Sequence, residues 1–214
     1  VIMTSHSPTL VSRIGIKRIN LLYEYNHKIY NYPLKTAGLN DEENDYLEKY
    51  LDVTKSQLFF AKGVIFVEGI SEAILVPEFA KLIERPLDKY AVELVNINGV
   101  GFSPFAKMMK NPEQDFGFAK ASIITDDDRC SDKQNAAYIS KDLDYDDDLT
   151  GILEKIESGT PSDRYNAIST LCHDNAVKCF GAIKTFEYAL ALEQNNVPYI
   201  LDAISTAYPI AGPR

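Results

Sequence analysis

The sequence has few cysteines and no long apolar run, and both shortages exclude classes of protein. It contains three cysteines, Cys130, Cys172 and Cys179, among 214 residues. An odd number without paired metal-binding spacing argues against a disulfide scaffold and a zinc ribbon, and it fits a reducing cytoplasm. No stretch approaches the roughly 20 apolar residues that a membrane span requires, and the N-terminus has no signal-peptide pattern. The sequence therefore predicts a cytoplasmic protein without a membrane partner.

Basic residues are also in short supply, with 22 Lys and Arg against 31 Asp and Glu, for a net charge of −9. A protein that holds nucleic acid by charge alone should be basic, so this simple mode of binding is excluded. An acidic protein can still act on nucleic acid where its carboxylates hold divalent cations. Residues 120–150 concentrate the acid, with nine Asp and four Lys or Arg. This stretch is either a solvated acidic surface or a metal site with an acidic loop beside it.

Apolar runs alternate with helical patterns from residue 63 onward, in a chain whose apolar fraction of 45% is typical of a folded protein. The patterns predict strands at 63–67, 92–97, 121–125 and 176–183, and helices at 73–84, 103–110, 149–158 and 184–194. Strands and helices that alternate with short links indicate an α/β fold with a largely parallel sheet flanked by helices.

The first 60 residues follow a different pattern. Residues 9–32 mix apolar, basic and tyrosine positions, which is consistent with strands or an edge hairpin, and residues 41–58 have near-helical spacing. The polar, acidic composition of residues 36–45 makes them the best candidate for a linker. The apolar start of the sequence has the composition of the middle of a strand, so we expect the chain to be part of a longer protein.

Acidic residues follow two of the predicted strands at the point where each strand ends. Glu68 closes the first strand and Glu72 lies on the opening turn of the next helix, while Asp126 and Asp128 lie on one side of the third strand's end, with Asp127 turned away. Parallel strands place such positions at one edge of the sheet. Carboxylates without His or Cys favour Mg²⁺ or Mn²⁺ over zinc. An isolated Glu of this kind can also be a helix-terminal residue, and an isolated Asp-x-Asp a turn.

Four blocks of the sequence resemble one family of proteins. The blocks are LFFAKGVIFVEGISEAILVP (58–77), VNINGVGFSPF (95–105), ASIITDDDR (121–129) and IKTFEYALAL (183–192). They resemble the Toprim domain of the OLD (overcoming lysogenization defect) family nucleases, a wider group that includes the Gabija-type phage-defence nucleases. In that family a Rossmann-like Toprim nuclease domain follows an ABC-type ATPase domain. The opening VIMTSHSP resembles the end of such an ATPase. The resemblance therefore assigns residues 1–50 to an ATPase remnant and linker, and residues 51–214 to the Toprim nuclease domain.

The resemblance implies roles for individual residues. Glu68, Glu72, Asp126 and Asp128 correspond to ligands of two Mg²⁺ or Mn²⁺ ions, with Glu68 also counted as catalytic. Lys184 corresponds to a catalytic lysine that stabilises the transition state.

Three further residues have supporting or remote roles in this interpretation. Glu187, three residues after Lys184 on the predicted helix, either positions that lysine, completes the metal shell or is an exposed neighbour. Arg129 either contacts phosphate or neutralises Asp127 or Asp132. His6 matches the nucleotide-switch histidine of the parent ATPase.

Together these expectations describe a metal-dependent DNA endonuclease, the catalytic part of an ATPase-coupled protein. No G-x-x-x-x-G-K-[S/T] motif occurs in the sequence, so ATP is expected to act only in the full-length protein. The expected partners are DNA and the parent's ATPase domain, and self-association is left open. Two alternatives remain: a non-catalytic DNA- or partner-binding Toprim module, or a primase-like enzyme.

Overall fold

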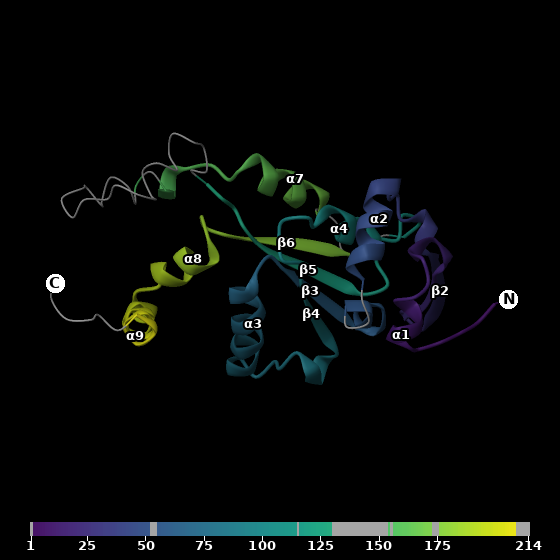
Figure 1. Cartoon of the computed structure of the whole chain (residues 1–214), viewed down its shortest axis with the longest axis horizontal. Coiled ribbons are helices and arrows are strands. Elements are labelled where there is room, and N and C mark those ends of the chain that lie inside the picture. Colours follow the sequence, from purple (N-terminus) through teal and green to yellow (C-terminus); the bar gives the residue numbers. More distant parts are fainter. Residues whose placement is uncertain are drawn as a thin grey trace. The chain divides into compact units, whose positions relative to one another are not determined.

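The computed structural model describes residues 2–51, 55–114, 116–129, 154, 156–172 and 176–208. The chain forms two compact units, one made of residues 1–125 and 166–180 and the other of residues 126–165 and 181–214 (Figure 1). The acidic run from Asp132 to Asp148, most of the predicted helix at 149–158, and Cys130 lie outside the described residues.

A four-stranded sheet lies at the centre of the fold, with strand order β4-β3-β5-β6 (Figure 1). The strands are β3 (Gly63–Val67), β4 (Val92–Asn96), β5 (Lys120–Asp126) and β6 (Val177–Ala182). β3 pairs in parallel with both β4 and β5. The N–H groups of Ala121 and Asp127 donate to the carbonyls of Ala176 and Ala182, each at 2.9 Å. Both segments advance by six residues between the two bonds, so β6 runs parallel to β5. The predicted parallel α/β sheet is therefore confirmed.

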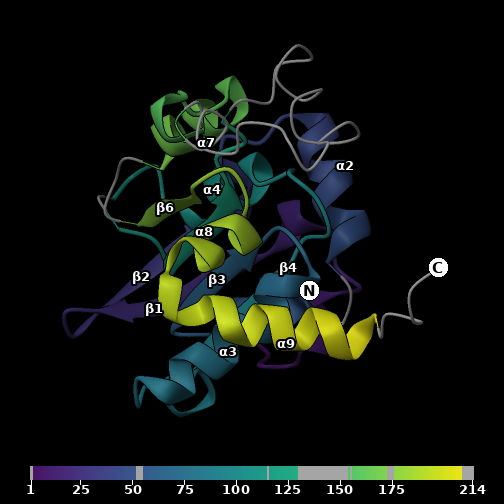
Figure 2. The ribbon, with the colours of Figure 1, turned by 90° about the vertical axis from the view of Figure 1, so that its left-hand side faces the viewer.

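Helices connect and follow these strands. α3 (Ile70–Leu82) links β3 to β4, and α4 (Ser103–Met109) lies between β4 and β5. Beyond the sheet, the second unit contains α8 (Phe186–Leu192), which leads through the 3₁₀ turn Gln194–Asn196 into α9 (Val197–Ala207) (Figure 2). α7 (Asp163–Leu171) and α9 were not predicted from the sequence. Among the described residues, the helices are all too short or too polar to cross a membrane.

The predicted N-terminal hairpin is confirmed as β1 (Asn20–Tyr25) paired with β2 (Lys28–Pro33) in antiparallel register. Asn26 and His27 join the strands with φ angles of 50° and 60°. Two consecutive left-handed residues make the type of two-residue turn that matches the twist of a hairpin. His27 is fully exposed at the tip. Before the hairpin come α1 (Pro8–Val11) and the 3₁₀ turn Ile16–Arg18.

α2 (Asp41–Tyr50) is shorter than the predicted helix at 41–58. It begins with a capping box, because Asn40 Oδ1 accepts from the Glu43 N–H at 2.8 Å and Glu43 Oε2 accepts from the Asn40 N–H at 3.0 Å. A separate 3₁₀ helix follows at Lys55–Phe60 and places Leu58 and Phe59 in the core.

Residues 1–50 share one hydrophobic core with the sheet. Ile16, Tyr32 and Leu47 are buried in the same cluster as Phe66 and Phe105 of β3 and α4. The Tyr32 hydroxyl also donates to the Met108 carbonyl at 3.1 Å. The prediction of a linker at 36–45 is wrong, because these residues begin α2 and are held against the common core. The assignment of residues 1–50 to an ATPase remnant stays a prediction.

Candidate functional site

The end of β3 carries two glutamates with different surroundings. Glu68 Oε2 accepts a hydrogen bond from the Thr125 hydroxyl at 2.6 Å, across the β3–β5 pairing. Thr125 is fully buried, so this bond fixes Glu68 against the neighbouring strand. Glu72 is 4% exposed and its Oε2 accepts from the Gly69 N–H at 3.1 Å, which caps the start of α3. Glu72 thus has the helix-terminal role that the sequence left open, and its role as a metal ligand stays a prediction.

The three consecutive aspartates at the end of β5 point in different directions. Asp126 Oδ1 accepts from the Phe186 N–H at 2.8 Å, at the start of α8. Asp127 is 3% exposed, whereas the Asp128 side chain is 37% exposed. Asp128 has a φ of 49°, a left-handed conformation that Asp tolerates better than most residues. Asp127 is thus the buried member of the three, and the predicted strand alternation does not extend to Asp128, because β5 ends at Asp126.

Asp127 is a structural residue that ties together the loops around it. Its carboxylate accepts from the Arg129 N–H at 3.0 Å, from Arg129 Nε at 2.8 Å and from the Lys184 N–H at 2.9 Å. Arg129 Nη2 completes the ion pair at 2.7 Å. Burial opposes ionisation of Asp127, but the hydrogen bonds from Arg129 and Lys184 outweigh it and hold the pKa of this carboxyl below its ordinary value. Of the alternatives for Arg129, neutralisation of Asp127 is the one observed.

Lys184 lies in the loop between β6 and α8, not on the helix. Its φ is 59°, and its carbonyl accepts from the Asp128 N–H at 3.2 Å. α8 begins at Phe186, with Thr185 as the N-cap residue that accepts from the Tyr188 N–H at 3.1 Å. The prediction that Lys184 and Glu187 share a helix face is therefore wrong, because the left-handed residue and the cap precede the helix. Glu187 lies in the first turn of α8, where the helix dipole favours a carboxylate.

Arg164 is a site residue that the sequence interpretation missed. It is the second residue of α7, and its Nε and Nη2 donate to Asp128 Oδ2 at 3.0 and 2.5 Å. Nη2 also donates to the Asp126 carbonyl at 2.8 Å. The text Pro-Ser-Asp at 161–163 is a helix-start signal that could have located α7. An arginine at such a start opposes the helix dipole, which indicates an acidic partner nearby.

One family model of known protein domains matches part of the chain. Residues 59–128 match the family model of the overcoming lysogenization defect protein-like TOPRIM domain. This stretch of the chain is similar to an OLD-like Toprim domain. The matched stretch includes Glu68, Glu72, Asp126 and Asp128, the four carboxylates at the ends of β3 and β5.

Individual proteins are similar to parts of the chain. Endonuclease GajA of Bacillus cereus (strain HuB5-5) is 32% identical over 65 residues, which are 30% of this chain and 9% of that protein. The chain thus matches only a small part of this curated relative. The solved C-terminal region of the Xanthomonas campestris pv. campestris OLD protein is 24% identical, with a TM-score of 0.46 over 73% of this chain and 66% of that one. The corresponding Burkholderia pseudomallei region is 22% identical, with a TM-score of 0.42 over 69% and 66%.

The chemistry of the candidate ligands suits a hard divalent cation. The candidate ligands are all carboxylates, the oxygen donors that Mg²⁺ and Mn²⁺ prefer. Among the residues that the structure describes, no three acidic, His or Cys side chains come together as a metal-binding group. Mg²⁺ commonly keeps several waters and uses one or two carboxylates together with substrate phosphate. Asp128 already has a positively charged partner, because the Arg164 guanidinium forms an ion pair with its Oδ2.

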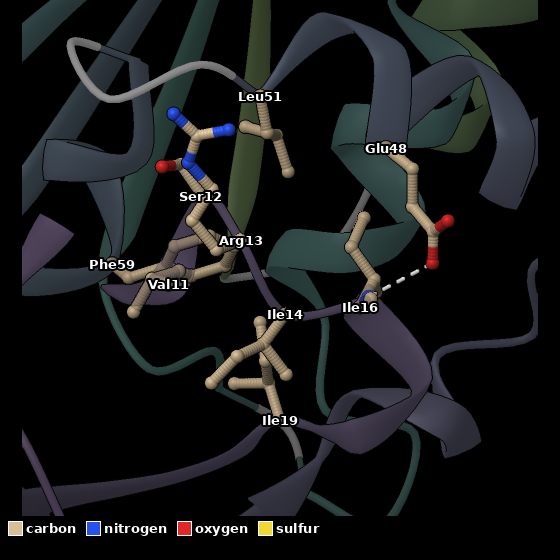
Figure 3. A pocket seen from close by; sticks show the side chains of 10 residues that line it. Val11, Ser12, Arg13, Ile14, Ile16, Ile19, Glu48, Leu51 and Phe59 are labelled. Atoms are coloured by element: carbon tan, nitrogen blue, oxygen red, sulfur yellow. Dashed lines mark hydrogen bonds between the residues drawn. The ribbon is translucent and has the colours of Figure 1, made fainter. Parts of the chain in front are cut away.

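His6 lies in the N-terminal segment, in the same compact unit as Glu68. His6 is exposed, and its ring centroid lies 6.0 Å from that of Phe60. The residues that follow α1 line a pocket of about 140 Å³ together with Glu48 of α2 (Figure 3). In it, Glu48 Oε1 accepts from the Ile16 N–H at 3.1 Å. Its lining also includes the charged Arg13 and apolar residues such as Ile14 and Leu51, but none of the predicted site residues. The switch role of His6 stays a prediction for the parent protein.

Proposed function

We propose that the Toprim domain hydrolyses DNA phosphodiester bonds with the help of Mg²⁺ or Mn²⁺. The observation that carries this proposal is the family match over the strand ends that hold Glu68, Glu72, Asp126 and Asp128. The likeness to Endonuclease GajA supports a nuclease rather than a primase or a passive binding module. The OLD-like match also supports a parent protein in which an ATPase domain controls the nuclease and in which ATP is used. A role in phage defence follows from the same likeness and is part of the proposal.

Each residue has a defined task in this proposal. The four carboxylates supply oxygen ligands to one cation or a pair of cations, which when bound would polarise the scissile phosphate and lower the pKa of the attacking water. The Thr125 hydroxyl holds Glu68, and the Phe186 N–H holds Asp126, so that both carboxylates stay oriented.

Lys184 offers an ammonium group to the charge that develops on the phosphate in the transition state. Its backbone is fixed by Asp127 on one side and by Asp128 on the other. The position of its Cα therefore depends on the same loop that carries two of the aspartates. Arg129 is committed to Asp127 and acts as a structural residue in this mechanism.

Plasmid nicking in Mg²⁺ or Mn²⁺ tests the activity, and thermal unfolding tests the ligands. A cation that binds only the folded state raises the melting temperature. The wild-type chain should nick plasmid DNA, and millimolar Mn²⁺ should raise its melting temperature. The Glu68→Ala/Asp126→Ala double variant should lose both effects.

A matched control replaces two exposed acids away from the strand ends, Glu78→Ala/Asp88→Ala, which should keep both effects. An equal metal-induced shift in the Glu68/Asp126 variant would refute the ligand assignment. Metal binding without any cleavage would leave a binding module instead of a nuclease.

A further inference from the structure

Arg164 occupies one of the carboxylates that the proposed function assigns to a cation. Its guanidinium donates twice to Asp128 Oδ2, at 3.0 and 2.5 Å, and once to the Asp126 carbonyl at 2.8 Å. All three groups belong to the same compact unit. A divalent cation coordinated by Asp128 would lie within a few ångströms of a positive guanidinium, and like charges at such distances repel strongly.

The start of α7 holds Arg164 at this place. Ser162 donates its N–H to the Asp127 carbonyl at 2.8 Å, and its hydroxyl caps the helix by accepting from the Tyr165 N–H at 3.2 Å. The Tyr165 ring lies directly over Gly181 of β6, where an added Cβ would be 2.4 Å from the ring. The hydrogen bond of Ser162 to Asp127 places the start of α7 beside the end of β5, while the long Arg164 side chain can still change rotamer.

The ion pair between Arg164 and Asp128 is more exposed than the one between Arg129 and Asp127, so its arginine can more readily be replaced by another cation. The side chains of Arg164 and Asp128 are 25% and 37% exposed, against 16% and 4% for Arg129 and Asp127. The two bonds from Arg164 to Asp128 fall on one carboxylate oxygen, whereas the Nε and the N–H of Arg129 use both oxygens of Asp127. A partly exposed pair of this kind contributes less to stability than a buried one, since exposed pairs are worth only about 0–1 kcal/mol. A divalent cation in direct contact with the carboxylate can displace it.

We propose that Arg164 is an exchangeable partner of Asp128 and a DNA-positioning residue. It neutralises Asp128 while no cation is bound, gives up this carboxylate when a cation arrives, and then donates to a phosphate oxygen of the DNA. Guanidinium suits this second partner because its planar fork matches phosphate as well as carboxylate. The inference rests on the proposed function for the nature of the ligand at Asp128.

Mn²⁺ binding to the whole chain, without DNA, tests the exchange directly. Titration followed by the electron paramagnetic resonance of free Mn²⁺ gives the affinity without any cleavage. Arg164→Gln keeps a long polar side chain but removes the charge, and it should bind Mn²⁺ about three- to tenfold more tightly, the scale of a lost competing ion pair. Arg164→Lys keeps the charge and should stay close to wild type.

Arg85→Ala is the matched control for total charge. Arg85 follows α3, at the edge of the sheet away from the strand ends, and it contacts Tyr90. This variant should bind Mn²⁺ as the wild type does. Equal or weaker binding in Arg164→Gln would overturn the exchange and make Arg164 a support for Asp128. If neither the wild-type chain nor any variant binds Mn²⁺, the proposed function fails at its metal site, and this outcome is distinct from a failure of the exchange alone.

DNA affinity measured against salt tests the second half of the proposal. With Ca²⁺ in place of Mn²⁺, under conditions without detectable cleavage, Arg164→Gln should lower the slope of log K against log salt by about one, the value for one lost phosphate contact. Arg164→Lys should retain most of the slope. An unchanged slope in Arg164→Gln, together with tighter Mn²⁺ binding, would overturn the phosphate contact while the exchange stands.

Discussion

Asp127 and Asp128 are consecutive residues, each paired with an arginine, yet the two pairs have opposite properties. Asp127 is buried and its carboxylate accepts from Arg129 and from the Lys184 backbone. Asp128 is open to solvent and pairs through one oxygen with Arg164. Both residues follow β5, which ends at Asp126, and the left-handed φ of 49° at Asp128 turns the chain there, so the two side chains meet different surroundings.

The contrast indicates a division of labour at the end of one strand. The inward aspartate joins the loop after β5 to the loop between β6 and α8, and so sets the backbone position of Lys184. The outward aspartate is left accessible for a cation. A single strand end thus combines a buried structural pair with an open pair that can change partner.

The largest effect is expected from removing the charge of the buried aspartate. Asp127→Asn leaves Arg129 without its buried partner, which should lower the free energy of unfolding by about 3 kcal/mol. Asp128→Asn is the matched control, since it breaks the exposed pair and should cost no more than about 1 kcal/mol. Urea unfolding followed by circular dichroism measures both. Equal losses in the two variants would show that the two ion pairs contribute equally to the free energy of unfolding, against this prediction.

The next effect concerns activity rather than stability. Only the backbone of Lys184 takes part in the Asp127 network, so Lys184→Ala should unfold almost as the wild type does. Its cleavage rate should fall by about 10²–10³-fold, the scale for losing one electrostatic stabiliser of the transition state. Lys184→Arg should not fully restore the rate.

Lys178→Ala, at the beginning of the same strand β6, is the control for this loss of charge. Lys178 is exposed, and its replacement should leave the cleavage rate unchanged. Single-turnover kinetics on the three variants measure these rates. Full activity in Lys184→Ala would reduce this residue to a surface lysine.

The smallest expected effect is a change with pH in how much the Asp127 charge contributes to the free energy of unfolding. Because the pKa of Asp127 is lowered in the folded chain, its charge stabilises the fold above the ordinary carboxyl pKa of about 3.9, and this contribution disappears as pH falls through the folded value. The stability difference between wild type and Asp127→Asn should therefore shrink below about pH 4, with a slope of at most about 1.4 kcal/mol per pH unit. Unfolding curves between pH 3 and pH 6 measure it. A difference that stays constant over this range would show that Asp127 does not titrate as proposed.

Much of the fold could be predicted because its signals are local. The apolar run that became β3 is short, uninterrupted and followed by turn residues, as a strand buried on both faces requires. The hairpin turn at Asn26 and His27 likewise depends on two adjacent residues. The positions of Glu68 and Asp126 at neighbouring strand ends then followed from the parallel order of the sheet.

The errors concern contacts between residues that are far apart in the sequence. The helical spacing of Lys184 and Glu187 did not reveal that Asp127, 57 residues earlier, holds the Lys184 N–H and delays the helix to Phe186. The polar composition of residues 36–45 suggested a linker, yet the flanking Leu34 and Leu47 are both fully buried in the common core.

The sequence by itself determined the class of fold, the resemblance to one family of domains and the residues that end its strands, because periodicity and short motifs are properties of neighbouring residues. Only the tertiary structure decided what each acidic residue contacts. Glu72 caps a helix, Asp127 is locked to Arg129, and Asp128 faces Arg164 from a helix 36 residues later. Carboxylates of the same chemistry acquire different roles through burial and through the partners that the fold brings to them, and neither is encoded in the spacing of the residues alone.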